Sequence, residues 1–247
     1  MRIYTIIFAL LLLGFAIACG DANTSAEPEN QAADTTATDT DTSSVPPAQL
    51  HYLALGDSYT IGESVDYEER YPVQLVRHLT DDEIYFRDPT IIATTGWTTP
   101  QLKDGIAEAD LREAYDLVSL LIGVNNQYQS KPVDLYRTEF RELLETAIEL
   151  ADRDTSRVFV LSIPDYAYTP FGQGRNPEKI SQELDLYNAI NRDITAEYGI
   201  TYFDITPISR QGLADPELVA SDKLHPSGKM YAAWVDLLYE DVREKLQ

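Results

Sequence analysis

From residue 51 onward, short apolar runs alternate with longer segments in which apolar residues recur every three or four positions. The short runs are rich in Val, Ile, Leu and Phe, as expected of strands buried on both faces, and lie at 51–55, 90–94, 116–122, 157–163 and 200–205. The longer, amphipathic segments predict helices at 71–80, 99–114, 132–152, 178–198 and 227–245.

Proline and glycine residues mark the ends of these predicted helices. Pro72, Pro100, Pro132 and Pro177 fit first-turn positions, and Gly199 ends the fourth helix. Regular alternation of strand and helix predicts an α/β protein with a mainly parallel, five-stranded sheet between two helical layers. We expect a three-layer α/β/α sandwich with the flavodoxin-like strand order 2-1-3-4-5.

The beginning of the chain has a different pattern. Arg2 precedes an uncharged apolar run at 3–18, and Cys19, the only cysteine, follows directly. A basic residue before a short apolar run is typical of a secretory signal peptide, and the run is shorter than the roughly 20 residues that cross a bilayer. The small residues before Cys19 resemble a bacterial lipobox. We therefore expect residues 1–19 to be a signal peptide with a lipidated Cys19; ordinary signal cleavage is the alternative.

Residues 20–50 contain no aromatic and no basic residue, and are rich in Thr, Ala, Asp, Ser and Glu. Such a segment buries too little apolar surface to offset the entropy of ordering, which predicts a disordered acidic tether. Residues 51–247 then form the folded domain. The expected location is the bacterial cell envelope, periplasmic or outer surface, reached by export and held by the lipid anchor.

Charge and composition exclude several classes of function. The 247 residues include 19 basic and 41 acidic side chains, a net charge of −22, which disfavours nucleic acid and anionic membrane surfaces as partners. Membrane contact is expected only through the anchor. With one cysteine and 3 histidines, the chain offers neither a disulfide framework nor a zinc motif, so we expect no metal and no cofactor.

Chemically informative peptides follow the predicted strands. In parallel α/β sheets, ligands bind beyond the carboxyl ends of the strands. The peptides at these ends are Gly56-Asp57-Ser58-Tyr59, Gly96-Trp97-Thr98, Gly123-Val124-Asn125-Asn126 and Pro164-Asp165-Tyr166, and the loop Ser221-Asp222-Lys223-Leu224-His225-Pro226 follows the last strand.

Together these peptides resemble the four motif blocks of the GDSL, or SGNH, hydrolase superfamily. The blocks are Gly-Asp-Ser at 56–58, Gly96, Gly-x-Asn at 123–125 and Asp-x-x-His at 222–225, in the family order and across nearly the whole domain. Two positions depart from the pattern: Tyr59 replaces the Leu of the family name, and Asn126 stands where many members have Asp.

Ser58 is the candidate nucleophile, because it follows an apolar strand directly. A serine hydroxyl needs an adjacent general base, and of the histidines only His225 lies in a loop at the same sheet edge. His51 opens the first strand at the opposite end, and His78 lies late in a helix. Asp222, three residues before His225, is placed to orient the imidazole. The alternative for Asp222 is a cap of the following helix.

Acyl transfer also requires donors for the oxyanion. The resemblance assigns this role to the backbone N–H groups of Ser58 and Gly96 and to the side-chain amide of Asn125. Gly96 is alternatively only a turn glycine. We expect Asp57 to pair with loop amides and Asp165 to act as a cap rather than as a catalytic acid.

Five aromatic residues belong to the same sheet edge: Trp97, Tyr128, Tyr166, Tyr168 and Phe171. The candidate substrate-binding residues among them are Trp97, Tyr128 and Tyr166. They predict an apolar wall that binds the substrate, a small acyl or aryl ester, beside the nucleophile; the alternative is that the rings only pack the loops. The loops are too short for a large lid, which favours an open pocket.

The sequence therefore predicts a serine hydrolase that cleaves carboxylic esters through an acyl-enzyme on Ser58. A carbohydrate deacetylase or a lysophospholipase with the same machinery is the alternative among enzymes. A non-catalytic surface-binding lipoprotein is the alternative from another class, and the presence of Ser58, Asn125 and His225 together disfavours it. The α/β-hydrolase elbow Gly-x-Ser-x-Gly is absent, because Thr60 occupies its last position.

Overall fold

The computed structural model describes residues 49–246, so the predicted signal peptide, Cys19 and nearly all of the tether lie outside the described residues. Five parallel strands form one sheet in the order β2-β1-β3-β4-β5. The strands are β1 (Tyr52–Gly56), β2 (Thr90–Ala93), β3 (Leu117–Leu121), β4 (Val158–Leu161) and β5 (Thr201–Phe203). Both the number of strands and their order confirm the prediction.

Burial explains why the strands are continuous apolar runs in the sequence. Every residue of the central strands β1, β3 and β4 is buried, whereas the edge strands β2 and β5 are only partly buried. In the register of the sheet, Leu55 lies between Ile92 of β2 and Leu120 of β3. Side chains on both faces of such a strand lose contact with water, so neither face favours polar residues.

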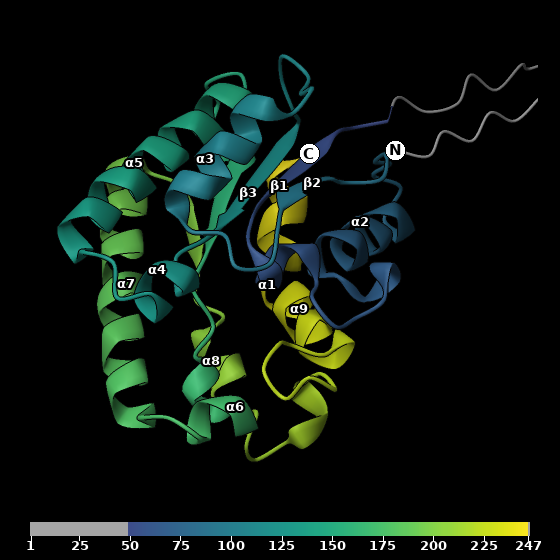
Figure 1. The fold of residues 1–247 in the computed structure, drawn as a ribbon. Helices are drawn as coiled ribbons and strands as arrows, with labels where there is room; N and C mark the ends of the chain where they lie inside the picture. Colours follow the sequence, from purple (N-terminus) through teal and green to yellow (C-terminus); the bar gives the residue numbers. More distant parts are fainter. Residues whose placement is uncertain (1–48, 247) are drawn as a thin grey trace, which may run out of the picture. The chain divides into compact units, whose positions relative to one another are not determined.

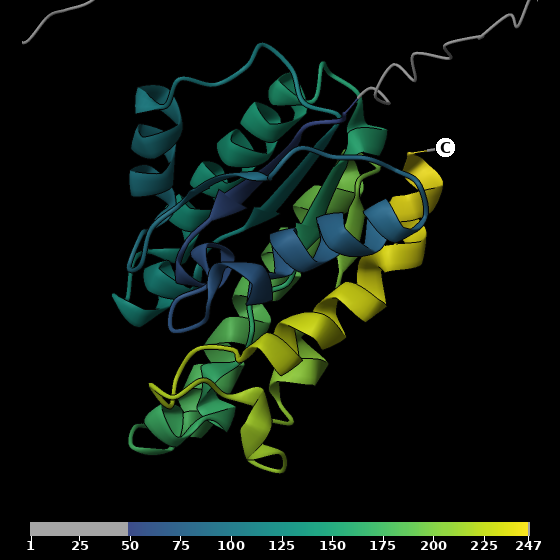
Figure 2. The same cartoon turned by 90° about the vertical axis from the view of Figure 1, so that its right-hand side faces the viewer.

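Long helices cover both faces of the sheet (Figure 1). On one face, α2 (Tyr71–Asp81) and α9 (Gly228–Lys245) pack against each other. On the other face lie α3 (Thr99–Glu108), α5 (Val133–Leu150) and α7 (Pro177–Glu197). Figure 2 shows the same layers with the α2–α9 side toward the viewer. The expected three-layer α/β/α sandwich is thus confirmed. Within residues 49–246, no helix combines the length and apolar character needed to span a membrane.

Short helical turns connect these elements. They are α1 (Ser58–Ile61), α4 (Val124–Tyr128), α6 (Pro170–Gln173), α8 (Thr206–Ser209), and the 3₁₀ turns η1 (Tyr67–Glu69), η2 (Thr155–Arg157), η3 (Tyr166–Tyr168) and η4 (Pro216–Leu218). In Figure 1, α1, α4, α6 and α8 gather at one end of the sheet, beyond the carboxyl ends of the strands. These segments were too short to be predicted from periodicity.

One predicted helix is longer than the real one. The pattern predicts a helix over 99–114, but α3 ends at Glu108, because Ala109 has an extended backbone. Beyond it, Tyr115 is buried, and its backbone N–H donates to the carbonyl of Leu150, 2.8 Å away. The apolar residues after 108 therefore pack the loop into the core instead of continuing the helix.

Candidate active site

Ser58 is the first residue of α1 and follows β1 after a tight turn. A side chain on Gly56 has no room there, since its Cβ would lie 2.1 Å from Thr60 Oγ1 and 2.5 Å from the carbonyl oxygen of Leu121. Asp57 caps α1: its Oδ1 accepts the N–H of Tyr59 at 3.1 Å. The strand and this cap place the largely buried Ser58 at the carboxyl edge of the sheet.

His225 and Asp222 form a contacting pair in the loop before α9. His225 Nδ1 lies 2.5 Å from Asp222 Oδ2, while Asp222 Oδ1 accepts the N–H groups of Leu224 and His225 at 2.9 and 3.0 Å. The ring of buried Tyr59 packs edge-on against the imidazole, with centroids 5.7 Å apart. Asp222 therefore stabilises its own loop and orients the imidazole. It does not cap the following helix, because the N-cap of α9 is Ser227.

Hydrogen bonds keep Asp222 ionised. Burial by itself raises the pKa of this carboxyl, but hydrogen bonds from His225, from the loop amides and from Ser64 outweigh burial and lower the pKa to about 2. Ser64 Oγ donates to Asp222 Oδ2 at 2.8 Å. The sequence did not predict this role of Ser64, because Ser64 belongs to no recognisable motif and its partner Asp222 is distant in the chain.

Gly96 and Asn125 are the other candidate oxyanion residues besides Ser58. Gly96 has a φ of 87°, and a Cβ placed on it meets no atom within 4 Å, so this face of the backbone is open. Within residues 49–246, the N–H of Gly96 donates to no protein group. Asn125 Nδ2 donates to the carbonyl of Trp97 at 2.9 Å, and within residues 49–246 its second hydrogen has no acceptor.

The neighbouring Asn126 has a different environment. It is buried, its Oδ1 accepts the N–H of Thr99 at 3.1 Å, and its Nδ2 donates to Thr99 Oγ1 at 2.6 Å. Asn126 therefore joins α4 to the start of α3 instead of facing the cavity.

A cavity of about 250 Å³ brings the candidate residues together. It is lined by Ser58, Tyr59, Thr95, Gly96, Val124, Asn125, Tyr128, Tyr166, Phe171, Leu224 and His225. Two of the three predicted substrate-binding residues, Tyr128 and Tyr166, line it. The third, Trp97, does not: its indole lies against Gly105 of α3, where an added Cβ would be 2.3 Å from the ring. Only its carbonyl, which accepts from Asn125, supports the site.

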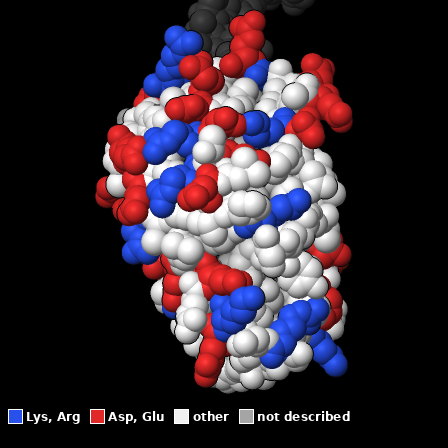
Figure 3. Space-filling view, turned by 60° about the vertical axis from the view of Figure 1, so that its left-hand side comes forward, with Lys and Arg blue, Asp and Glu red and all other residues white. Residues whose placement is uncertain are grey.

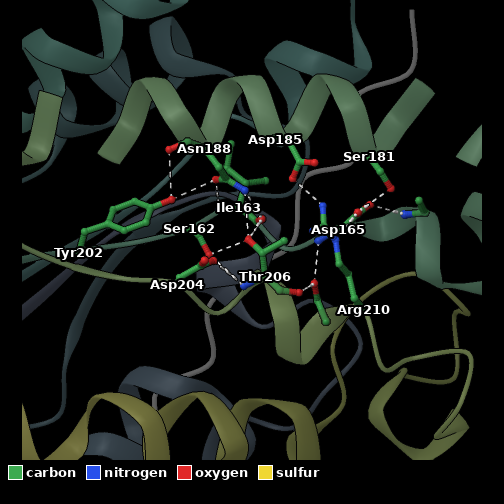
Figure 4. A network of polar contacts seen from close by, with 12 residues as sticks. Ser162, Ile163, Asp165, Ser181, Asp185, Asn188, Tyr202, Asp204, Thr206 and Arg210 are labelled. Atoms are coloured by element: carbon green, nitrogen blue, oxygen red, sulfur yellow. Dashed lines mark hydrogen bonds and ion pairs between the residues drawn. The ribbon is translucent and has the colours of Figure 1, made fainter. Parts of the chain in front are cut away.

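A polar network surrounds Asp165, the residue that precedes Tyr166 in the chain (Figure 4). Asp165 is fully buried; its Oδ1 accepts the N–H of Ala167 at 3.0 Å, and its Oδ2 accepts from Ser181 Oγ at 2.6 Å and Arg210 Nε at 2.9 Å. In Figure 4, Arg210, at the end of α8, extends toward Asp165 and toward Asp185 on α7. Asp165 is a cap of η3, as the sequence predicts, and lies outside the cavity lining.

The other two histidines lie away from the cavity. His51 precedes β1, where its backbone N–H donates to Asp116 Oδ2 at 2.8 Å, and His78 lies in the last turn of α2 beside the ring of Tyr239. Among the described residues, no group of three or more His, Cys, Asp or Glu side chains is arranged to hold a metal ion.

Asp57 differs electrostatically from Asp222. Burial raises its pKa to about 7, although the N–H groups of Tyr59 and Gly123 oppose the rise. Its Oδ2 is buried and, within the described part of the chain, has no hydrogen-bond partner. The predicted pairing with loop amides is present, but it satisfies only one carboxyl oxygen.

Comparison with known proteins identifies the family. The model of the GDSL-like Lipase/Acylhydrolase family matches residues 54–233. The fold is similar to Axe2, an acetylxylan esterase from Geobacillus stearothermophilus (TM-score 0.61, 19% identity, 78% of this chain and 94% of that chain). It is also similar to TesA (0.61, 15%, 79% and 99%) and to a lipase/acylhydrolase from Enterococcus faecalis (0.59, 19%, 81% and 98%). No curated protein sequence matches significantly. The chain belongs to the GDSL-like lipase/acylhydrolase family.

Proposed function

We propose that this hydrolase cleaves carboxylic esters through an acyl-enzyme on Ser58. One observation carries the proposal: Ser58, Gly96, Asn125 and His225 come from four separate segments of the chain and line a single cavity. Asp222 contacts the histidine from outside this cavity. A nucleophile, a base, an orienting acid and two kinds of oxyanion donor are the groups that acyl transfer needs.

In acylation, Ser58 Oγ attacks the ester carbonyl carbon while His225 Nε2 takes its proton. Asp222 accepts from Nδ1, so the other ring nitrogen is free to act as the base, and the carboxylate stabilises the imidazolium that forms. Collapse of the tetrahedral intermediate breaks the bond to the alkoxy oxygen, which leaves as the alcohol with the proton from His225. Water then attacks the acyl-enzyme by the same steps and releases the carboxylic acid and Ser58.

Three donors stabilise the tetrahedral intermediate. The N–H of Ser58 lies at the start of α1. Among the described residues, the N–H of Gly96 has no acceptor, and one amide hydrogen of Asn125 has none. The carbonyl of Trp97 and the Asn126–Thr99 bonds hold the Asn125 segment against the Gly96 loop. Such donors act mainly in the transition state, because the charge on the oxygen exists only there.

The size and the apolar lining of the cavity suit a substrate with a small acyl group. Its wall is formed mostly by Val124, Tyr128, Tyr166, Phe171 and Leu224. Solved structures of the acetylxylan esterase Axe2 include catalytic mutants in which a serine or a histidine is replaced by alanine. That likeness supports the proposed roles of Ser58 and His225 and keeps carbohydrate deacetylation within the proposal. A lysophospholipase is the other variant of the same chemistry.

Hydrolysis of p-nitrophenyl acetate and butyrate tests the proposal. The wild-type chain should hydrolyse them, Ser58→Ala and His225→Ala should each remove most turnover, and the double variant should lose little more, since the two residues act as one unit. An organophosphonate should label Ser58 alone, as read by peptide mass spectrometry. Labelling of a different serine, or full turnover by His225→Ala, would refute the assignment. A surface-binding protein without catalysis would show neither turnover nor labelling.

The proposed location rests on sequence. The run at 3–18 and Cys19 support export and a lipid anchor in the cell envelope, which would leave the domain free on the tether at 20–50.

A further inference from the structure

A second hollow adjoins the cavity that contains Ser58. Its volume is about 340 Å³, and it shares Tyr128 and Tyr166 with the first cavity. The two rings stand edge to face, with centroids 6.3 Å apart, and line both spaces. A substrate that extends past these rings reaches both hollows. We call the second space the Arg175 hollow; Gln127, Arg175, Lys179 and Glu183 also line it.

The two spaces differ in charge. In the part of the chain that the structure describes, no Lys, Arg, Asp or Glu lines the cavity of Ser58, whereas two cations and one carboxylate line the Arg175 hollow. Lys179 Nζ lies 3.6 Å from Glu183, which leaves Arg175 without a counter-charge: within residues 49–246, no carboxylate lies within ion-pair distance of it. Arg175 thus places an unpaired positive charge in a hollow that shares two lining residues with the cavity of Ser58. Figure 3 shows acidic and basic side chains interspersed over the visible face, and at its lower end basic side chains stand beside acidic ones.

Arg175 is held in place by residues of the first cavity. Its guanidinium carbon lies 3.5 Å from the ring centroid of Phe171 and 5.7 Å from that of Tyr128. Its NH1 donates to the carbonyl of Phe171 at 3.1 Å, and its NH2 donates to the hydroxyl of Tyr128 at 3.2 Å. A guanidinium has further N–H donors besides these, and fixing the side chain in advance reduces the entropy lost on binding.

These observations identify the ligand by its chemistry. An acyl group suits the apolar cavity of Ser58, so the part of the substrate left to reach the Arg175 hollow is the alcohol. A planar guanidinium held next to a lysine suits an oxyanion such as a carboxylate or a phosphate. We propose that the Arg175 hollow binds an anionic group on the alcohol portion of the ester, which makes Arg175 a specificity-determining residue. This inference rests on the esterase function proposed above.

Matched pairs of soluble esters test the proposal. One pair is the butyryl ester of glycerol and that of glycerol phosphate; the other is acetylated methyl glucoside and acetylated methyl glucuronide. Each pair shares its acyl group and differs in the anion, so the ratio of the two kcat/KM values isolates recognition of charge. A larger ratio for the glycerol pair would indicate that the hollow binds a phosphate, and a larger ratio for the glucoside pair would indicate that it binds a carboxylate. The variants are Arg175→Gln, Arg175→Lys and, as a matched control, Arg192→Gln. Arg192 is likewise exposed and stacked on a tyrosine, Tyr202, but does not line either hollow.

The wild-type chain should prefer the anionic ester of at least one pair, and Arg175→Gln should reduce that preference about tenfold, the loss expected for one hydrogen bond to a charged group. Arg175→Lys should restore part of it, added salt should weaken it, and Arg192→Gln should keep it. A general disturbance of the site by Arg175→Gln would lower both rates and leave the ratio unchanged, which would overturn the proposal, as would a wild-type preference for neutral esters. Absence of hydrolysis of all four esters would count against the esterase function itself.

Discussion

Ser64 and Asp222, separated by 158 positions in the chain, share a hydrogen bond of 2.8 Å between Ser64 Oγ and Asp222 Oδ2. This is the same carboxylate oxygen that contacts His225 Nδ1. Ser64 has a left-handed backbone with a φ of 67°, and its neighbour Glu63 accepts a hydrogen bond from Thr95, beside Gly96. The segment after α1 thus contacts both the acid that orients the histidine and the loop that carries the candidate oxyanion glycine.

Ser64→Ala should lower kcat about two- to tenfold and change KM little, because an exposed hydrogen bond contributes about 0.5–1.5 kcal/mol and acts here on the position of Asp222. Ser64→Gly should behave in the same way, although glycine relaxes the left-handed backbone. Ser156→Ala is the control, since Ser156 also donates to a surface aspartate, Asp154, far from the cavity. Steady-state kinetics of the three variants make the comparison. Equal rates for Ser64→Ala and Ser156→Ala would remove Ser64 from the positioning of Asp222.

Substitution of the adjacent residues Asn125 and Asn126 should have different effects on activity and stability. Asn125→Ala removes a donor to the oxyanion, so kcat should fall by roughly 10²–10³ while the melting temperature changes little. Asn126→Ala removes the buried bonds to Thr99, so it should cost about 1–3 kcal/mol of folding free energy with the smaller loss of kcat. Kinetics and thermal melts of both variants make the test. A larger kcat loss for Asn126→Ala at an unchanged melting temperature would place the oxyanion donor one residue later.

Asp57 should make stability depend on pH near neutrality. Its pKa is about 7 in the folded protein against an ordinary value of 3.8, so between these values the folded chain holds a proton that the unfolded chain has released. The free energy of unfolding should therefore fall as pH rises from about 4 to 7, by on the order of 4 kcal/mol, and level off above.

Asp57→Asn is the matched variant, because it keeps an acceptor for Tyr59 and loses the titration. Urea melts between pH 4.5 and 8 should give a flatter profile for the variant than for the wild type. Asp222 does not mask the effect: its lowered pKa contributes stability that is lost only as pH falls below its ordinary value of 3.8. Parallel profiles for the two proteins would show that Asp57 does not titrate in this range.

Loss of Arg210 should cost far more than loss of a surface arginine. Arg210→Ala leaves the fully buried Asp165 carboxylate without its ion-pair partner, which should destabilise the fold by about 3 kcal/mol. The loop that carries Tyr166 should also loosen, and KM should rise. Arg153→Ala, which removes the pair between two exposed side chains, Arg153 and Glu149, should cost less than about 1 kcal/mol. Chemical denaturation measures both, and similar costs for the two variants would contradict the structural role of the Asp165–Arg210 pair.

Cys19 lies outside the described residues, and its lipidation stays a prediction from sequence. Expressed in a bacterial host, the wild-type chain should partition into detergent, and mass spectrometry should find diacylated Cys19 as its first residue. Cys19→Ala should release the chain or block its processing. A wild-type chain that remains in the aqueous phase and begins at another residue would exclude the anchor without affecting the enzymatic proposal.

Local patterns in the sequence determined the fold class. Five apolar runs predicted the five parallel strands, because strands buried on both faces consist almost entirely of apolar residues. The strand order is also the one expected, because consecutive elements of the chain usually lie side by side. The motif blocks also sufficed to predict which residues meet: Ser58, Gly96, Asn125 and His225 follow strands or lie at the same sheet edge, and parallel strands bring their carboxyl ends together.

Tertiary structure alone decided how the side chains around these residues lie. Trp97 follows Gly96 directly, yet its indole turns to Gly105, because a glycine on α3 leaves space for a large ring. Ser64, Arg210 and Arg175 have no sequence pattern, since each acts through a partner that only folding brings within reach: Asp222, Asp165 and Tyr128. A hydrogen bond or ring contact depends on side-chain directions to within a few ångströms, and periodicity along a chain specifies only which face is buried.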